Sequence, residues 1–214
     1  MPLRTVLRVT LCASLCLVVR ALPAHGQTAE ELYNEGTTLS KAGKTDEAVA
    51  KLRQAVQLKP ELAPAHFNLG IAYEKKGALD DAIVAYQEAV RCKPDAKYYQ
   101  SLGLVYRKSK LLPAAIEAYK KAAAADPKNP NIFYNLGNAY LDKDALADAI
   151  ANYEKALALR YPSPAAVHLN LGIAHQKQGA DELAIKAYQA YLKAAPRAAN
   201  AKQIQETIAG LQQE

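Results

Sequence analysis

Apolar and small residues recur along the chain with a period close to 34 residues. Asn-Leu-Gly occurs at 68–70, 135–137 and 170–172, Ser-Leu-Gly at 101–103, and Asn-Glu-Gly at 34–36. The five glycines that close these triplets follow one another at intervals of 34, 33, 34 and 35 residues. A period this regular indicates one supersecondary unit copied five times.

Placing each of these glycines at position 8 of its unit divides the chain into five repeats and a tail. The repeats are expected at residues 29–62, 63–95, 96–129, 130–164 and 165–198, and the tail at 199–214. In each repeat, positions 4, 7, 8 and 11 lie on one face of a helix, and positions 20, 24 and 27 on one face of a second helix. Position 20 is alanine in all five repeats, and position 24 is tyrosine in four.

Helix-breaking residues separate the predicted helices. Gly43, Gly77 and Gly179 occupy position 15, where a left-handed residue can end the first helix. Proline, which cannot continue a helix, follows the second helix in every repeat, at Pro60, Pro94, Pro127, Pro162 and Pro196. Each repeat is therefore predicted to be two antiparallel helices joined by a short turn.

The tail has a different pattern. Ile204 and Ile208 share one face of a predicted helix with Leu211, while polar side chains occupy the other faces. Such a helix would cover the apolar end of the last repeat, because terminal units of a stack need a polar outer surface. The sequence thus predicts an all-α fold of eleven helices and no strands.

This pattern resembles the tetratricopeptide repeat (TPR) family over about residues 29–198. The resemblance rests on small residues at positions 8 and 20 in all five copies and at position 27 in four, and on large residues at positions 11 and 24. It implies a TPR α-solenoid of five helix-turn-helix repeats with a C-terminal capping helix. It also implies that positions 2, 5, 9, 12 and 13 of each first helix line a concave groove.

Apolar side chains at those positions, flanked by charged ones, would suit an extended or helical peptide. Phe67 and Ile71 are expected to face outward, and the asparagines at position 6 to bond a ligand backbone. The alternative is that the asparagines satisfy neighbouring helices and the apolar residues pack between repeats. The residues expected to contact a partner are Tyr33, Asn34, Phe67, Asn68, Ile71, Leu104, Arg107, Tyr134, Asn135, Asn138, Leu169, Asn170 and Ile173.

Residues 1–26 have the order of a secretory signal peptide. Arg4 and Arg8 precede an uncharged run at 9–19, and small residues follow up to Gly26. The run is shorter than the about 20 residues of a transmembrane helix. We therefore expect cleavage near Gly26 and Gln27, and a periplasmic or extracellular protein. The alternative is an uncleaved N-terminal membrane anchor.

Charge and cysteine content narrow the function further. Cleavage would remove three arginines, leaving 24 basic against 21 acidic residues and lowering the net charge from +6 to +3. A charge this small, spread along the chain, argues against nucleic-acid binding. Only Cys92 of the three cysteines would remain, so no internal disulfide is expected.

No catalytic set, cofactor, metal site or small-molecule substrate is expected. His66 and His168 at position 4, and His175 at position 11, are interpreted as core or lining residues, and Cys92 at position 30 as a packing residue. Glycine-rich phosphate loops, paired cysteines and His-Glu-x-x-His are absent from the sequence.

The expected function is a non-enzymatic exported scaffold that binds a protein or peptide, in the assembly of an envelope or secretion complex. Association with a membrane complex belongs to this expectation. The alternative is an accessory structural subunit of an envelope enzyme or secretion machine, with no peptide ligand of its own.

Overall fold

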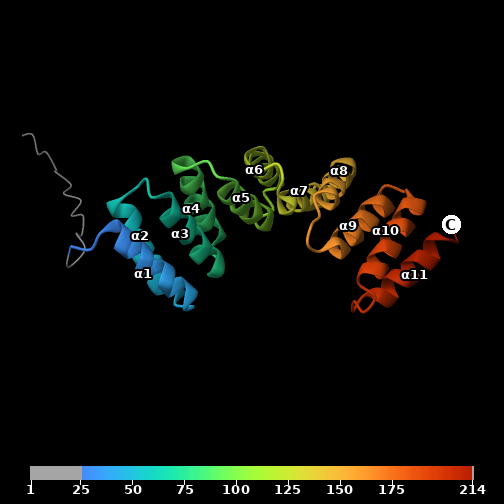
Figure 1. Ribbon diagram of the computed structural model, residues 1–214, viewed down its shortest axis with the longest axis horizontal. Coiled ribbons are helices and arrows are strands. Elements are labelled where there is room, and N and C mark those ends of the chain that lie inside the picture. Colours follow the sequence, from blue (N-terminus) through green and yellow to red (C-terminus); the bar gives the residue numbers. More distant parts are fainter. Residues whose placement is uncertain (1–25, 214) are drawn as a thin grey trace, which may run out of the picture.

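The computed structural model describes residues 26–213, which form eleven α-helices and no strand (Figure 1). The predicted all-α fold is therefore confirmed for this part of the chain. The helices are α1 (Ala29–Lys41), α2 (Thr45–Leu58), α3 (Ala63–Lys75), α4 (Leu79–Cys92), α5 (Ala96–Lys108), α6 (Leu112–Ala125), α7 (Pro130–Asp142), α8 (Leu146–Ala158), α9 (Pro164–Lys177), α10 (Asp181–Ala194) and α11 (Ala201–Leu211).

The predicted signal peptide falls outside the described residues, apart from its last residue, Gly26. The structure therefore does not test it. Between residues 26 and 213, no helix is both long enough and apolar enough to cross a membrane.

The two helices of a repeat meet where a glycine faces a large side chain. A Cβ atom added to Gly103 would lie 2.8 Å from the ring of Tyr119, and one added to Gly137 would lie 2.7 Å from the ring of Tyr153. Real Cβ atoms do not come this close, so each site accepts only glycine unless the ring moves. Both tyrosines are fully buried. Glycine at position 8 thus lets the helices approach as closely as the sequence predicted.

The turn between paired helices uses a left-handed residue in every repeat. Gly43, Gly77 and Gly179 have φ angles of +79°, +75° and +74°. The other two repeats place Lys110 (φ +60°) and Asp144 (φ +62°) at the same point. All five repeats therefore share this turn geometry, including the two that have no glycine at this position.

Odd-numbered helices lie on the inside of the arc seen in Figure 1. The pairs α1·α3, α5·α7 and α7·α9 are in contact, whereas consecutive even-numbered helices in the described chain make at most slight contact. A stack bends toward the side on which its elements lie closer together. Helices α1, α3, α5, α7 and α9 consequently form the concave face.

Helix α11 closes the C-terminal end of the stack. Its Ile204 and Ile208 are buried against Ala184, Tyr188 and Tyr191 of α10. This agrees with the predicted capping helix, since these apolar contacts cover a face of repeat 5 that has no following repeat.

Candidate partner-binding surface

The concave face carries the thirteen residues that the sequence analysis selected, but they differ in accessibility. Asn34 is exposed, whereas Phe67 and Asn138 are buried. The remaining ten are half-buried: Tyr33, Asn68, Ile71, Leu104, Arg107, Tyr134, Asn135, Leu169, Asn170 and Ile173.

The prediction that Phe67 faces outward is wrong. Its side chain is 4% exposed, and its ring stacks on Tyr98 of the next repeat with the ring centroids 4.7 Å apart. Lys97 covers it, with Nζ 4.6 Å from the ring centroid. Stacking and cation–π contacts both favour this placement. Phe67 therefore fills the joint between repeats 2 and 3 and is not available to a ligand.

Asn138 is also wrongly assigned to the ligand-binding set. Its Oδ1 accepts hydrogen bonds from Tyr153 Oη and from Asn170 Nδ2, both at 2.8 Å. Only 9% of the residue is exposed. A buried amide oxygen with two donors is already satisfied, so Asn138 links repeats 4 and 5.

The asparagines at position 6 favour the structural alternative where their contacts are seen. Asn68 Nδ2 donates to Thr37 Oγ1 of the preceding repeat at 2.8 Å. Asn170 makes the equivalent bond to Asn138. In both cases the side-chain amide bonds the first helix of the preceding repeat.

Polar bonds at positions 12 and 13 connect successive repeats along the concave face. Lys108 Nζ lies 2.5 Å from Glu74 Oε1, and Arg107 Nε lies 2.6 Å from Asp142 Oδ2. Tyr86 Oη donates to the other oxygen of Glu74 at 2.9 Å. Burial, reinforced by the charge of Glu74, raises the pKa of Tyr86 far above its usual value. The hydroxyl therefore stays protonated and remains a donor.

Leu104 differs from the other apolar residues of the face. Ile71 packs against the buried cluster of repeats 2 and 3, Leu169 and Ile173 pack against the cluster that repeat 5 forms with α11, and Tyr134 stacks on Tyr161. Leu104 is half-buried but belongs to none of the buried clusters of the described chain. It lies on α5, the middle helix of the face, one turn before Arg107 and Lys108.

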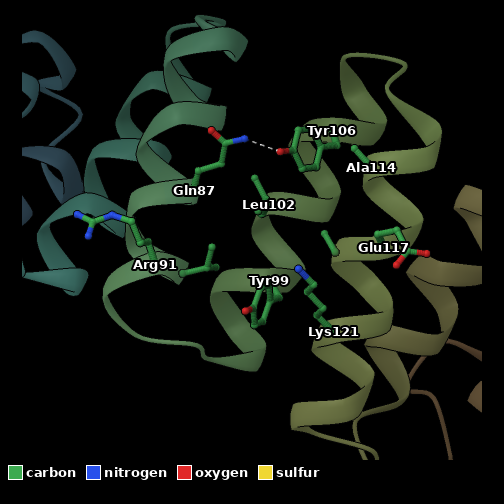
Figure 2. Close-up of a pocket in the computed structure, with 10 residues that line it drawn as sticks. Gln87, Arg91, Tyr99, Leu102, Tyr106, Ala114, Glu117 and Lys121 are labelled. Carbon is green, nitrogen blue, oxygen red and sulfur yellow. Dashed lines mark hydrogen bonds between the residues drawn. The ribbon is translucent and has the colours of Figure 1, made fainter.

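The convex side carries two grooves that the sequence analysis did not foresee. One, of about 420 Å³, lies between α4, α5 and α6; the other, of about 260 Å³, lies between α2, α3 and α4. Corresponding positions of successive repeats line both, because even-numbered helices diverge on the outside of the arc. Figure 2 shows the larger groove, where Gln87 Nε2 donates to Tyr106 Oη at 2.7 Å.

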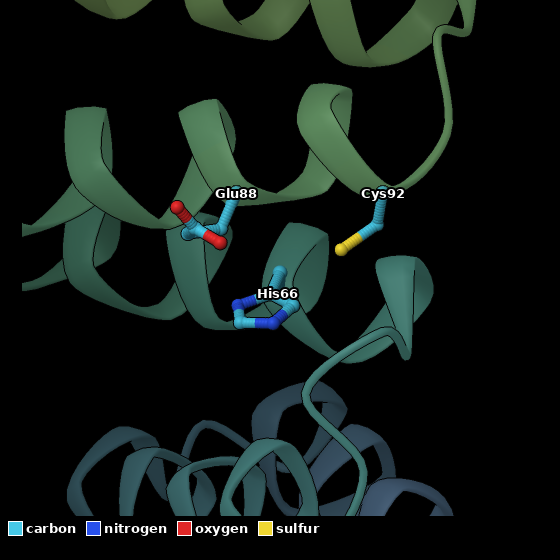
Figure 3. Close-up of side chains that lie close together, drawn as sticks. All are labelled: His66, Glu88 and Cys92. Atoms are coloured by element: carbon cyan, nitrogen blue, oxygen red, sulfur yellow. The ribbon is translucent and has the colours of Figure 1, made fainter.

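His66 and Glu88, which line the smaller groove, come together with Cys92 (Figure 3). The sequence pattern predicts His66 as a core or lining residue, Cys92 as a packing residue, and no metal site. Cys92 does pack against the buried cluster of repeats 2 and 3. Positions 4 and 26 are also in contact in two other repeats, where Lys121 lies over Tyr99 and Lys155 lies over Phe133. The shared repeat positions therefore carried a signal that Glu88 lies near His66.

Helix pairs stacked in an arc, with side chains of the odd-numbered helices lining its concave face, define an α-solenoid. This class of fold serves as a protein-interaction scaffold. The chain belongs to the TPR family. Models described as tetratricopeptide repeat match residues 33–97 and 166–198, and a model described as TPR repeat matches 103–144 and 137–179.

Solved structures agree with this fold. MamA is similar with a TM-score of 0.75 and 24% identity, over 83% of this chain and 96% of that one. MamA of Desulfovibrio magneticus RS-1 gives 0.74 and 21%, over 81% and 98%. YrrB, described as a TPR protein with an unusual peptide-binding site, gives 0.75 and 18%, over 83% and 92%. A comparison with curated proteins finds no match.

Proposed function

We propose that this chain is a non-enzymatic, exported scaffold that binds an extended segment of a partner protein along its concave face. The observation that carries the binding proposal is Leu104, an apolar side chain at the centre of that face that packs into none of the described clusters. TPR membership supports a protein or peptide partner. The order of charged, apolar and small residues in 1–26 supports export, and with it a role in envelope or secretion complex assembly.

The face favours a segment with an apolar side chain next to acidic ones. Positions 12 and 13 of the five repeats hold five basic and two acidic residues. Arg107 and Lys108, which flank Leu104, are each engaged by one carboxylate of a neighbouring repeat. The side chains of Arg107 and Lys108 stay 31% and 50% exposed in these pairs. Ion pairs open to solvent contribute little stability, so an acidic ligand can compete for the two cations.

A photo-crosslinking residue at position 104 tests the binding face. We expect one adduct of constant mass from position 104. Position 84 should give none, because Val84, although 59% exposed, lies on helix α4 of the convex side. Leu104→Asp should abolish capture of that partner by the purified protein, while Val84→Asp should leave capture unchanged.

Circular dichroism and thermal melting must first show that both aspartate variants are folded. Should Leu104→Asp unfold the chain, Leu104→Ser serves in its place. Undiminished capture by Leu104→Asp would remove the concave face from the proposal. Loss of capture by Val84→Asp would favour the convex side, where Val84 lines the smaller groove.

Export has a separate test. N-terminal sequencing of the protein from its native cells should give Gln27 as the first residue, in the periplasmic or extracellular fraction. An intact N-terminus in the membrane fraction would favour the anchor instead. An intact N-terminus in the cytoplasmic fraction would contradict export without affecting the binding proposal.

A further inference from the structure

Three side chains with metal-ligating atoms converge in repeat 2. His66 lies on α3, and Glu88 and Cys92 lie four residues apart on α4. One ligand atom from each residue lies within 4.8 Å of the other two, and all three residues are half-buried. Figure 3 shows the His66 ring lying between the Glu88 and Cys92 side chains. The set thus joins two helices that are adjacent in the repeat.

Neighbouring groups contact all three side chains, and the Cys92 thiol donates to the carbonyl oxygen of Pro60 with Sγ at 3.5 Å. His66 Nε2 lies 2.8 Å from the carbonyl oxygen of Pro60. When Nε2 carries the proton and donates it there, Nδ1 keeps a lone pair for a metal, in the way that outer hydrogen bonds fix histidine ligands. Arg91 bonds Glu88 through Oε2, at 2.6 and 2.8 Å. Oε1 takes no part in that ion pair and is the oxygen left to ligate.

The other repeats carry different combinations of residues at these positions. Positions 4, 26 and 30 hold Leu32, Gln54 and Leu58 in repeat 1; Tyr99, Lys121 and Ala125 in repeat 3; Phe133, Lys155 and Leu159 in repeat 4; His168, Ala190 and Ala194 in repeat 5. In repeats 3 and 4 the lysine Nζ lies over the aromatic ring, 5.8 and 4.0 Å from its centroid. The fold therefore needs no nitrogen, oxygen and sulfur ligands here, yet repeat 2 has all three.

We propose that His66, Glu88 and Cys92 bind one Zn²⁺ ion. Imidazole nitrogen, carboxylate oxygen and thiolate sulfur are its usual protein ligands, and at bond lengths of about 2.0 to 2.3 Å they place ligand atoms about 3.5 Å apart. The ligand atoms now lie within 4.8 Å of one another, and rotation of the three half-buried side chains can shorten these distances to the required value. Binding releases the Cys92 thiol proton to solvent and changes no oxidation state. Water completes the fourth position. Mg²⁺ and Ca²⁺, which prefer oxygen ligands, fit poorly.

Cobalt substitution tests the site directly, since thiolate ligation to Co²⁺ gives a near-ultraviolet charge-transfer band. The full chain carries Cys12→Ser and Cys16→Ser, so that Cys92 is its only thiol, and is purified without a histidine tag. We expect one Co²⁺ per chain with the thiolate band, and its displacement by one equivalent of Zn²⁺ but not by Mg²⁺. Zn²⁺ should also raise the melting temperature, because it binds the native state.

Substitutions taken from the other repeats identify the ligands without disturbing the fold. Cys92→Ala, which copies repeats 3 and 5, should remove the band. His66→Phe, which copies repeat 4, and Glu88→Gln should each weaken Zn²⁺ binding by about tenfold or more, a loss of about 1.4 kcal/mol. The control is His168→Phe, which removes a histidine at the same repeat position with only alanines beside it.

Metal-free melting curves establish that each variant is folded. As an independent measurement, Zn²⁺ should slow alkylation of Cys92 in the protein that has no other thiol. The proposal fails if the thiolate band is missing, if Zn²⁺ leaves the alkylation rate unchanged, or if His168→Phe weakens binding as much as His66→Phe does.

Discussion

At the scale of single residues, the tyrosines at position 24 show one side chain in different polar surroundings. Tyr153 donates to buried Asn138, and Tyr86 to Glu74. Tyr119 packs against its glycine in the same way, but its buried hydroxyl has no hydrogen-bond partner among the described residues. Burial raises the pKa of Tyr119, so the group stays neutral. The packing of the tyrosine ring is thus common to these repeats, whereas the hydrogen-bond partner of the hydroxyl differs from repeat to repeat.

Tyr119→Phe and Tyr153→Phe should consequently differ in stability. Removing the unpaired hydroxyl of Tyr119 should leave the free energy of unfolding unchanged or raise it by up to about 1 kcal/mol. Removing that of Tyr153 should lower it by about 1 to 3 kcal/mol, since a buried hydrogen bond to Asn138 is lost. Urea denaturation measures both. An equal loss in the two variants would mean that Tyr119 has a partner, such as an ordered water.

At the scale of elements, the turn after each first helix is set by its backbone bonds. Gly77 N donates to Glu74 O at 3.0 Å, and the next amide reaches back to Tyr73 O. Lys110 N donates to Arg107 O at the same distance, with the same backward bond from the next residue. These are the bonds of a helix end closed by a left-handed residue. Glycine adopts this conformation without strain because it has no Cβ atom, whereas the Cβ of an L-residue comes too close to the following carbonyl oxygen.

Lys110→Gly should therefore stabilise the chain, although the gain is reduced by the greater freedom of glycine when unfolded. We expect the free energy of unfolding to rise by about 0.5 to 1 kcal/mol. Gly77→Ala should lower it by about 1 kcal/mol, through conformation alone, because a Cβ there would meet nothing within 4 Å. Chemical denaturation of the two variants checks the pair, and a loss in Lys110→Gly would show that the lysine side chain makes stabilising contacts.

At the scale of the whole molecule, the stack is held by contacts between neighbours. Beyond its partner helix and the next repeat, each described helix has little contact with the rest of the chain. Stability is then approximately a sum over repeats and their joints. The C-terminal end depends on α11, whose Ile204 and Ile208 are 8% and 9% exposed.

Ile204→Asp should open the C-terminal end and leave the other end intact. Hydrogen exchange followed by mass spectrometry should show faster exchange in α9, α10 and α11, with α1 to α4 unchanged, because a charge buried against Tyr188 breaks only the last joint. Gln205→Asp, at the exposed neighbouring position, serves as the control and should change neither end. Uniformly faster exchange along the chain would show that the stack unfolds as one unit.

Much of this architecture could be predicted from the sequence. Glycine at position 8, alanine at 20 and tyrosine at 24 specified the helix pairs, because each position always meets the same partner within its own repeat. The alternating helices and the capping helix followed from the same period. The turns at Lys110 and Asp144 could be inferred only by analogy with the glycine-containing repeats, since lysine disfavours a left-handed φ and aspartate adopts one only occasionally.

Only the tertiary structure determined which side chains are buried, and what they contact, where repeats meet and where paired helices meet. Phe67 occupies a position expected to line the groove, yet it is covered by Tyr98 and Lys97 of the next repeat. Cys92 packs against a buried cluster, as the sequence predicted, but only the structure shows that His66 of α3 lies close to it. The repeat period determines the helix on which a residue lies and the face of that helix to which its side chain belongs. Its contacts depend on the residue that the neighbouring helix places opposite it, and that residue differs from repeat to repeat.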